Sequence, residues 1–191
     1  ASRARYNQAS SWAAQRNYSM AITLYLNVLE IEEQRGLDNP AIAEPLVGLA
    51  TVHLEMGLYG KAQDHYERAI SILENNQPIE TRALAFSLGG LAQCLIQQGH
   101  RVEAEPHYVR AIAMLEDQQR VNLREFGALM ANLASIYSAT GRTEAAESLF
   151  ERALEVLTKA YGSKHEVVAR VINELAETRQ ALGKKVDAEE S

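Results

Sequence analysis

Five histidines are the side chains most able to bind a metal, and two of them, His65 and His107, stand 42 residues apart. A zinc site needs three or four His, Cys, Asp or Glu side chains that converge on one point. Neither histidine has such a residue three or four positions further along the chain. The sequence therefore predicts no metal site, and we interpret His53 as a packed or partly exposed core residue.

Catalytic motifs are also missing from the sequence. Cys94 is the single cysteine and lies in a helical pattern, which is typical of a small core residue rather than a nucleophile. The acidic pairs Glu32-Glu33 and Glu189-Glu190 are adjacent, so their side chains diverge on a helix surface. No glycine-rich phosphate loop, nucleophile elbow or His-Glu-x-x-His segment occurs. We therefore predict a protein that is not an enzyme and that has no cofactor.

A pattern of small and aromatic residues recurs every 42 positions and must organise the fold. Its clearest copy is Ala134, Gly141, Ala146, Phe150 and Ala153. The same columns hold Ala92, Gly99, Ala104, Tyr108 and Ala111, then Ala50, Gly57, Ala62, Tyr66 and Ala69, and after the first copy Ala176, Gly183 and Ala188. Internal repeats of this length are the signature of a solenoid.

Each repeat predicts two helices, because its apolar residues are spaced by three or four positions. A glycine ends each first helix, where it permits a positive φ. Proline is tolerated best in a helix's first turn, so Pro106 should lie close to a helix start. Ile172, Leu175 and Ala176 should form the packed stripe of a last helix over about 166–182. We predict one array over residues 1–191, with repeats at about 1–36, 41–76, 79–120 and 122–162 and a half repeat or capping helix at 165–191.

Charge and hydropathy exclude two classes of partner. The net charge is −6 and no run of Lys and Arg occurs, which argues against nucleic acid and anionic membranes. The longest weakly polar stretch, 83–92, is far shorter than the roughly 18 apolar residues of a membrane span. We predict no membrane insertion and a cytoplasmic location, although the chain begins without Met, so a processed N-terminus and export stay open.

The repeat resembles a known family. It follows the tetratricopeptide pattern at Leu46, Leu49-Ala50, Gly57, Tyr59, Ala62, Tyr66 and Ala69. The ordinary tetratricopeptide repeat has 34 residues, and the longer period here is similar to the subtype found in kinesin light chains and bacterial relatives. Asn132-Leu133-Ala134, the segment 103–106 and the segment 161–165 support that subtype. The resemblance implies an all-α, right-handed superhelical solenoid whose first helices line a concave groove that binds a peptide.

Positions off the packed stripe of each first helix would line that groove. The resemblance thus assigns partner binding to Tyr6, Asn7, Val47, Thr51, Leu54, Phe86, Gln93, Ile96, Ala131, Asn132, Ser135, Arg170 and Asn173. Gly48, Gly89 and Gly90 should leave the middle of the groove shallow and give a bulky residue room to approach. An Asn in the Asn132 column commonly bonds a ligand's main chain in this family.

Three hypotheses about function remain open at this point. The first is a scaffold that binds a peptide or helix of another protein in the groove; because no Lys or Arg lies in its central part, this ligand should not be an acidic C-terminal tail. The second is self-association through exposed end helices, such as 166–182, which would make a homo-oligomer. The third is a peptide-sensing regulatory domain of a larger protein.

Overall fold

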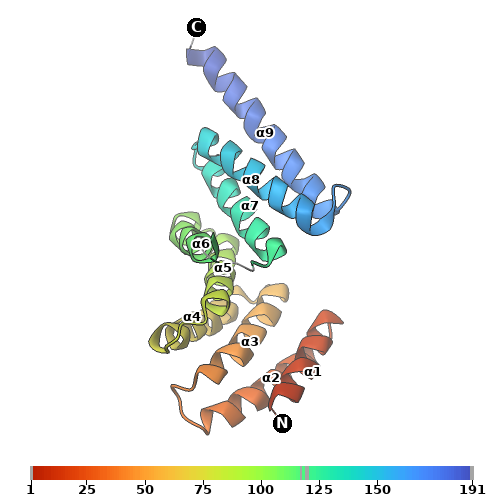
Figure 1. Cartoon of the computed structure of the whole chain (residues 1–191), viewed down its shortest axis with the longest axis vertical. Helices are drawn as coiled ribbons and strands as arrows, with labels where there is room; N and C mark the ends of the chain where they lie inside the picture. Colours follow the sequence, from red (N-terminus) through yellow and green to blue (C-terminus); the bar gives the residue numbers. More distant parts are fainter. Residues whose placement is uncertain (1, 117, 119–120, 190–191) are drawn as a thin grey trace. The chain divides into compact units, whose positions relative to one another are not determined.

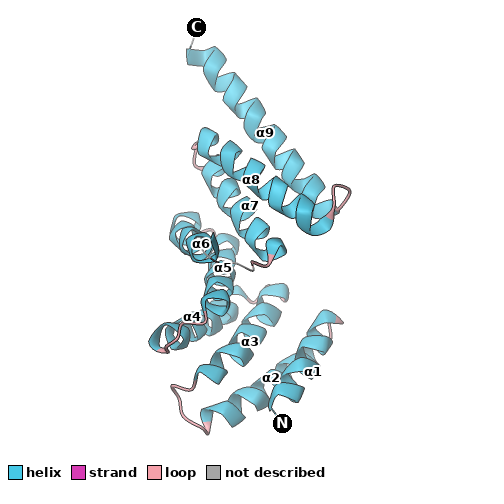
Figure 2. Cartoon of the chain, in the orientation of Figure 1, coloured by secondary structure: helices cyan, strands magenta, loops and turns pink. Residues whose placement is uncertain are grey.

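The computed structural model describes residues 2–116, 118 and 121–189, with side chains described as far as Gly183. Every regular element in these residues is helical (Figures 1 and 2). The elements are α1 (Ser2–Ala14), α2 (Tyr18–Glu33), the 3₁₀ turn η1 (Pro40–Ile42), α3 (Ala43–Glu55), α4 (Tyr59–Asn75), α5 (Thr81–Gln97), α6 (Arg101–Glu116), α7 (Leu123–Ala139), α8 (Thr143–Tyr161) and α9 (Glu166–Glu189).

The chain forms two compact units, which we describe separately. The first unit, Ala1–His107, packs α1 on α2 and α3 on α4, and α5 lies against α4. The second unit, Tyr108–Ser191, packs α7 on α8 and α8 on α9. In both units the alanine columns of the repeat are fully buried at the helix crossings, because small side chains let two helices approach closely. The aromatic column, Tyr25, Tyr66, Tyr108 and Phe150, is buried as well.

The turn inside each repeat is a Schellman motif built on the glycine that the sequence predicted. Gly57, Gly99 and Gly141 have φ values of +75°, +89° and +78°. In the first of these turns, Leu58 N donates to His53 O at 2.8 Å and Gly57 N donates to Leu54 O at 3.0 Å. The other two turns repeat both bonds. The prediction that glycine closes the first helices is therefore confirmed.

The first repeat makes the same turn without glycine. Arg16 takes the glycine position with φ +58°, and Asn17 N donates to Trp12 O at 2.9 Å. A left-handed conformation costs a residue with a Cβ roughly 1–2 kcal/mol. We expect Arg16→Gly to raise the free energy of unfolding by about 0.5–1 kcal/mol, because part of that gain is lost to the larger backbone entropy of glycine in the unfolded chain.

Urea denaturation followed by circular dichroism measures this change. Arg5→Gly in the middle of α1 is the matched control and should lower the free energy of unfolding, since glycine weakens a helix interior. Equal effects of the two substitutions would contradict the role that we give to Arg16.

Two expectations about helix boundaries are wrong. Pro106 is the sixth residue of α6 rather than part of its first turn, because helical bonding already begins where Ala104 N donates to His100 O. The last helix does not end at Leu182 but runs through Gly183 to Glu189. In earlier repeats a second helix packs back on the first, whereas no segment in the described residues folds back after Gly183.

The packed stripe of α9 also differs from the expectation. Its buried residues are Val168, Val171, Leu175 and Thr178, while Ile172 is 45% exposed and Ala176 is exposed. The buried set faces α8, the helix that precedes α9 in the chain. Ile172 and Ala176 belong to the columns that contact the second helix of the same pair, and the described part of the chain has no such helix for α9.

Candidate functional site

The first unit exposes one stripe along each of its first helices. Val47, Thr51 and Leu54 of α3 are half-buried, as are Gln93 and Ile96 of α5. Phe86 of α5 is 37% exposed, although most phenylalanines lie inside. On α1, Tyr6 is half-buried and Asn7 is exposed. Because α3 also contacts α5, the apolar side chains of these two helices lie on neighbouring elements.

The glycines of this stripe do not leave room for a ligand, contrary to our expectation. A Cβ added to Gly48 would lie 2.5 Å from Tyr25 Cε1, and one added to Gly90 would lie 2.2 Å from Tyr66 Cζ. Gly89 is buried as well. The space beside Gly48 and Gly90 is therefore filled by the tyrosine of the preceding second helix, so these glycines serve the packing of successive pairs.

The hydroxyl groups of the two tyrosines bond to polar residues of the exposed stripe. Tyr25 Oη lies 2.9 Å from Ser10 Oγ, and Tyr66 Oη lies 3.1 Å from Thr51 Oγ1. Burial raises the pKa of Tyr66 to about 12, so the phenol stays protonated at neutral pH. The hydroxyl of Thr51 also donates to Val47 O at 2.9 Å. Thr51 thus lies at the predicted surface, but its hydroxyl is already used by the fold.

In the second unit the predicted groove positions are smaller and more polar. Ala131 is buried, and Arg170 and Asn173 are exposed on α9. Asn132 Nδ2 donates to Tyr108 Oη at 3.2 Å, and Ser135 Oγ donates to Glu174 Oε2 at 2.7 Å. The amide of Asn132 therefore contributes to the contact between a second helix and the following first helix.

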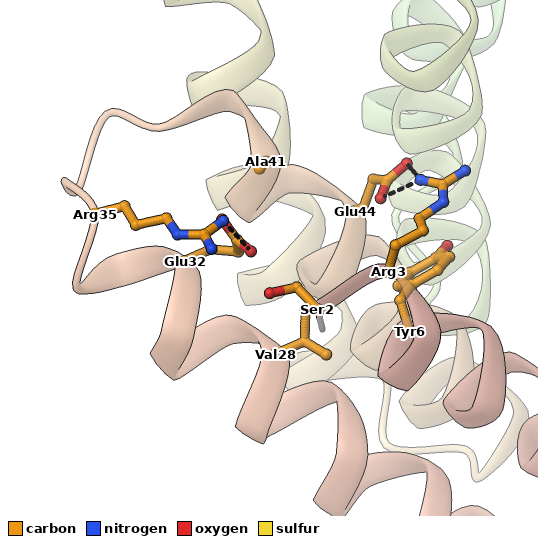
Figure 3. Close-up of a pocket in the computed structure, with 8 residues that line it drawn as sticks. All are labelled: Ser2, Arg3, Tyr6, Val28, Glu32, Arg35, Ala41 and Glu44. Atoms are coloured by element: carbon orange, nitrogen blue, oxygen red, sulfur yellow. Dashed lines mark hydrogen bonds and ion pairs between the residues drawn. The ribbon is translucent and has the colours of Figure 1, made fainter.

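A polar pocket of about 300 Å³ lies at one end of the stripe in the first unit (Figure 3). Two ion pairs flank it. Arg3 Nη1 donates to Glu44 Oε1 and Oε2 at 2.5 and 2.7 Å, and Arg35 Nη1 donates to Glu32 Oε1 and Oε2 at 2.9 and 2.8 Å. Ser2, Tyr6, Val28 and Ala41 complete the lining. Each arginine is matched by a carboxylate, so the pocket carries no net charge of either sign.

Sequence reasoning missed Glu32, although a signal was available. Glu32 stands 41 residues before Leu73, in a column that holds Leu115 and Leu157 in later repeats. It is 3% exposed, and a buried carboxylate needs partners to offset its lost hydration. Besides Arg35, Asn39 Nδ2 donates to Glu32 Oε2 at 3.1 Å. A charged residue in an otherwise apolar column therefore indicated a local polar cluster.

A second hollow of about 400 Å³ lies in the second unit, between α6, α7 and α8. Its walls include Val109, Ile112, Leu133, Tyr137 and Leu149. Arg152 Nη2 donates to Glu116 Oε1 at 2.6 Å beside it. None of the predicted groove residues lines this hollow.

The single cysteine is inert in this fold. Cys94 is fully buried on α5, and burial raises the pKa of its thiol to about 11. The thiolate is the reactive form of cysteine, and it is scarcely populated at neutral pH with such a pKa. The prediction of a core cysteine is confirmed. Among the described residues there is no group of three or more His, Cys, Asp and Glu side chains that could hold a metal ion.

Comparisons with known proteins agree with the geometry of the helix pairs. A tetratricopeptide repeat family matches residues 1–75 and 125–191, and a second tetratricopeptide repeat family matches residues 87–121. The search of curated proteins gave no match. In the described part of the chain no helix is both long and apolar enough to span a membrane.

Solved structures with the same fold include two with kinesin light chain names. A Podosopora anserina protein, named as a kinesin light chain with nearly identical TPR-like repeats, has a TM-score of 0.74 and 21% identity over 98% of this chain and 89% of that one. BtubC (BKLC) from P. vanneervenii has a TM-score of 0.78 and 21% identity over 95% of this chain and 72% of that one.

The apo form of RapI has a TM-score of 0.78 and 15% identity, over 96% of this chain and 64% of its own. At these identities the likeness concerns the fold, which is the all-α solenoid predicted from the repeat. Tetratricopeptide repeats generally act as non-enzymatic scaffolds for other proteins, so the fold indicates protein partners. The chain belongs to the tetratricopeptide repeat family, and its structural neighbours are kinesin light chain-like members of it.

Proposed function

We propose that this protein binds a peptide or helical segment of a partner protein through the exposed stripe of its first unit. The observation that carries this proposal is the apolar character of α3 and α5, where Val47, Leu54, Phe86 and Ile96 are accessible. The equivalent positions of the second unit hold Ala128, Ala131 and Ser138 on α7. An accessible aromatic side chain among aliphatic neighbours is a typical anchor for a partner.

The partner segment should present apolar side chains rather than a terminal carboxylate. Arg3 is engaged in two bonds with Glu44, and Arg170 Nε lies 4.0 Å from Glu174 Oε1. A carboxylate clamp needs cations that point at the ligand, whereas both arginines already face acidic residues of their own unit. The remaining predicted residues, including Asn7, Gln93 and Asn173, supply polar contacts around the apolar centre. We further propose that all repeats belong to one array.

Selection from a displayed peptide library, followed by fluorescence anisotropy titrations, tests this function. We expect Phe86→Ala to weaken binding of the selected peptides by about tenfold or more, because it removes the largest accessible apolar side chain of the stripe. Leu26→Ala is the matched control, since Leu26 is a similarly exposed apolar residue on the second helix α2.

Equal effects of the two substitutions would contradict binding at this stripe. A peptide with an acidic C-terminal tail should show no saturable binding, and micromolar affinity for it would overturn our view of the ligand. Circular dichroism of each variant checks that the helices are retained.

Self-association through α9 is a second candidate, favoured by one observation. Ala169, Ile172 and Ala176 are exposed, although their counterparts on α3, such as Ala43, Leu46 and Ala50, are buried. Light scattering over a range of concentrations should show a mass that rises with concentration and falls back to that of the monomer in Ile172→Glu. A constant monomer mass in the wild type would exclude this candidate.

A further inference from the structure

The first unit contains a pair of stacked histidines that the sequence did not suggest. His53 lies in the last turn of α3 and His65 lies on α4, so the two imidazoles meet across a helix–helix contact. Their ring centroids are 5.2 Å apart and the ring planes differ by 11°. Parallel stacked rings do not aim their nitrogens at a shared point, so this arrangement does not suit a metal ion.

His53 is poorly placed to carry a charge. It is 9% exposed, and its Nδ1 atom is buried without a hydrogen-bond partner in the described part of the chain. A neutral imidazole can leave its unprotonated nitrogen there, whereas an imidazolium carries a proton on both nitrogens and would bury an unpaired donor. Burial, and then the charge of Lys61, lower the pKa of His53. The native packing thus favours the neutral ring.

The charges around His65 act mostly in the same direction. Burial and then the neighbouring His53 lower the pKa of His65; Arg68 and Lys61 lower it as well, and Asp64 opposes them. The packed elements add little compensation. Glu33 of α2 is paired with Arg68 at 2.6 Å, and the single charged residue of α5, Arg82, lies in that helix's first turn. Only Asp64 therefore favours the protonated form of His65.

We propose that the His53–His65 stack makes the α3–α4 pair an acid-sensitive joint, which loosens when both rings are protonated and thereby releases a partner from the stripe on α3. The second part of this proposal rests on the proposed function, because α3 carries Val47, Thr51 and Leu54 of that stripe. Two imidazolium ions in stacked contact repel each other, and moving α3 away from α4 relieves both the repulsion and the buried unpaired donor.

The direction of the pH dependence follows from the lowered pKa values of both histidines. Near pH 6.5 the unfolded chain binds protons that the folded pair still excludes. Stability is therefore greatest above that pH and falls as the pH drops through the window between the unfolded and folded pKa values. We expect the unfolding equilibrium constant to rise by about tenfold or more between pH 7.5 and pH 5.5, as a combined shift of at least one pKa unit requires.

Three measurements on the full chain test the joint without any ligand. Imidazole proton resonances should show His53 and His65 titrating at lower pH than His100, which is exposed and paired with Glu103. Urea denaturation should show a smaller pH dependence in His65→Gln than in the wild type, while His100→Gln, the matched control, should keep the full dependence. Amide exchange at pH 5.5, corrected for intrinsic rates, should accelerate in α3 and α4 more than in α7 and α8.

The proposal is overturned if His53 and His65 titrate together with His100, or if His65→Gln and the wild type share one pH dependence. His65→Phe provides a second variant, because it keeps a stacked ring on His53 but cannot be protonated. Peptides selected by the wild type should be released at pH 5.5 and retained by His65→Phe. Retention by the wild type at pH 5.5, with the stability results intact, would remove the release step and leave the joint in place.

Discussion

Gly90→Ala is expected to lower the free energy of unfolding by about 2–3 kcal/mol, which is a large fraction of the stability of a domain. A Cβ at this position would lie 2.2 Å from Tyr66 Cζ and 2.6 Å from two further atoms of the same ring. Tyr66 is buried and its hydroxyl is bonded to Thr51, so the ring cannot turn away without breaking that bond. Either α5 must move away from α4 or the ring must leave its site.

A double-mutant cycle identifies the cause of this loss. Tyr66→Leu shortens the side chain that meets the new methyl group, so Gly90→Ala should cost much less in its presence than alone. Gly60→Ala is the matched control, because no atom lies within 4 Å of a Cβ added at Gly60 in the first turn of α4. Additive costs for Gly90→Ala and Tyr66→Leu, measured by urea denaturation, would show that the two positions do not oppose each other as described.

Phe150→Ala is expected to cost about 3–5 kcal/mol of unfolding free energy, because it removes a large side chain from the core of the second unit. Phe150 is 1% exposed and lies on α8 between two fully buried alanines, Ala146 and Ala153. These alanines are held by the backbone, so the surrounding helices cannot collapse into the space that the ring leaves. Thermal and urea denaturation measure the loss.

Phe86 supplies the control within the same chain. It is the same residue type on a first helix, but it is 37% exposed, so Phe86→Ala should change stability by less than about 1 kcal/mol. The pair of substitutions separates the structural aromatic from the one assigned to binding. A comparable loss of stability in both variants would contradict that division of roles.

Much of the local structure was readable from residue spacing. The predicted glycine turns at Gly57, Gly99 and Gly141 all have positive φ, because a glycine-closed helix end is a local motif. Pro106 and Gly183 were harder to predict, because the end of a helix also depends on what packs beside it. Pro106 is tolerated within α6, and α9 continues through Gly183 where no second helix covers it in the described residues.

The candidate site was predictable only in part. Helical spacing located the accessible stripe that includes Val47, Leu54 and Phe86, since accessibility along a packed helix is periodic. It did not reveal that Tyr25 fills the space beside Gly48, because that contact joins a second helix to the following first helix. A glycine in a sequence shows that space is needed, but the side chain that occupies the space lies elsewhere in the chain.

The sequence by itself determined the repeat, the helix pairs, the buried alanine and aromatic columns and the absence of a recognisable catalytic motif, because these depend on composition and on spacing within about 42 residues. Only the tertiary structure showed that His53 stacks on His65, that Glu32 is held in a polar cluster and that Ile172 is exposed. Each of these depends on which helix packs against which. That information resides in three-dimensional contacts, which residue spacing along one helix does not encode.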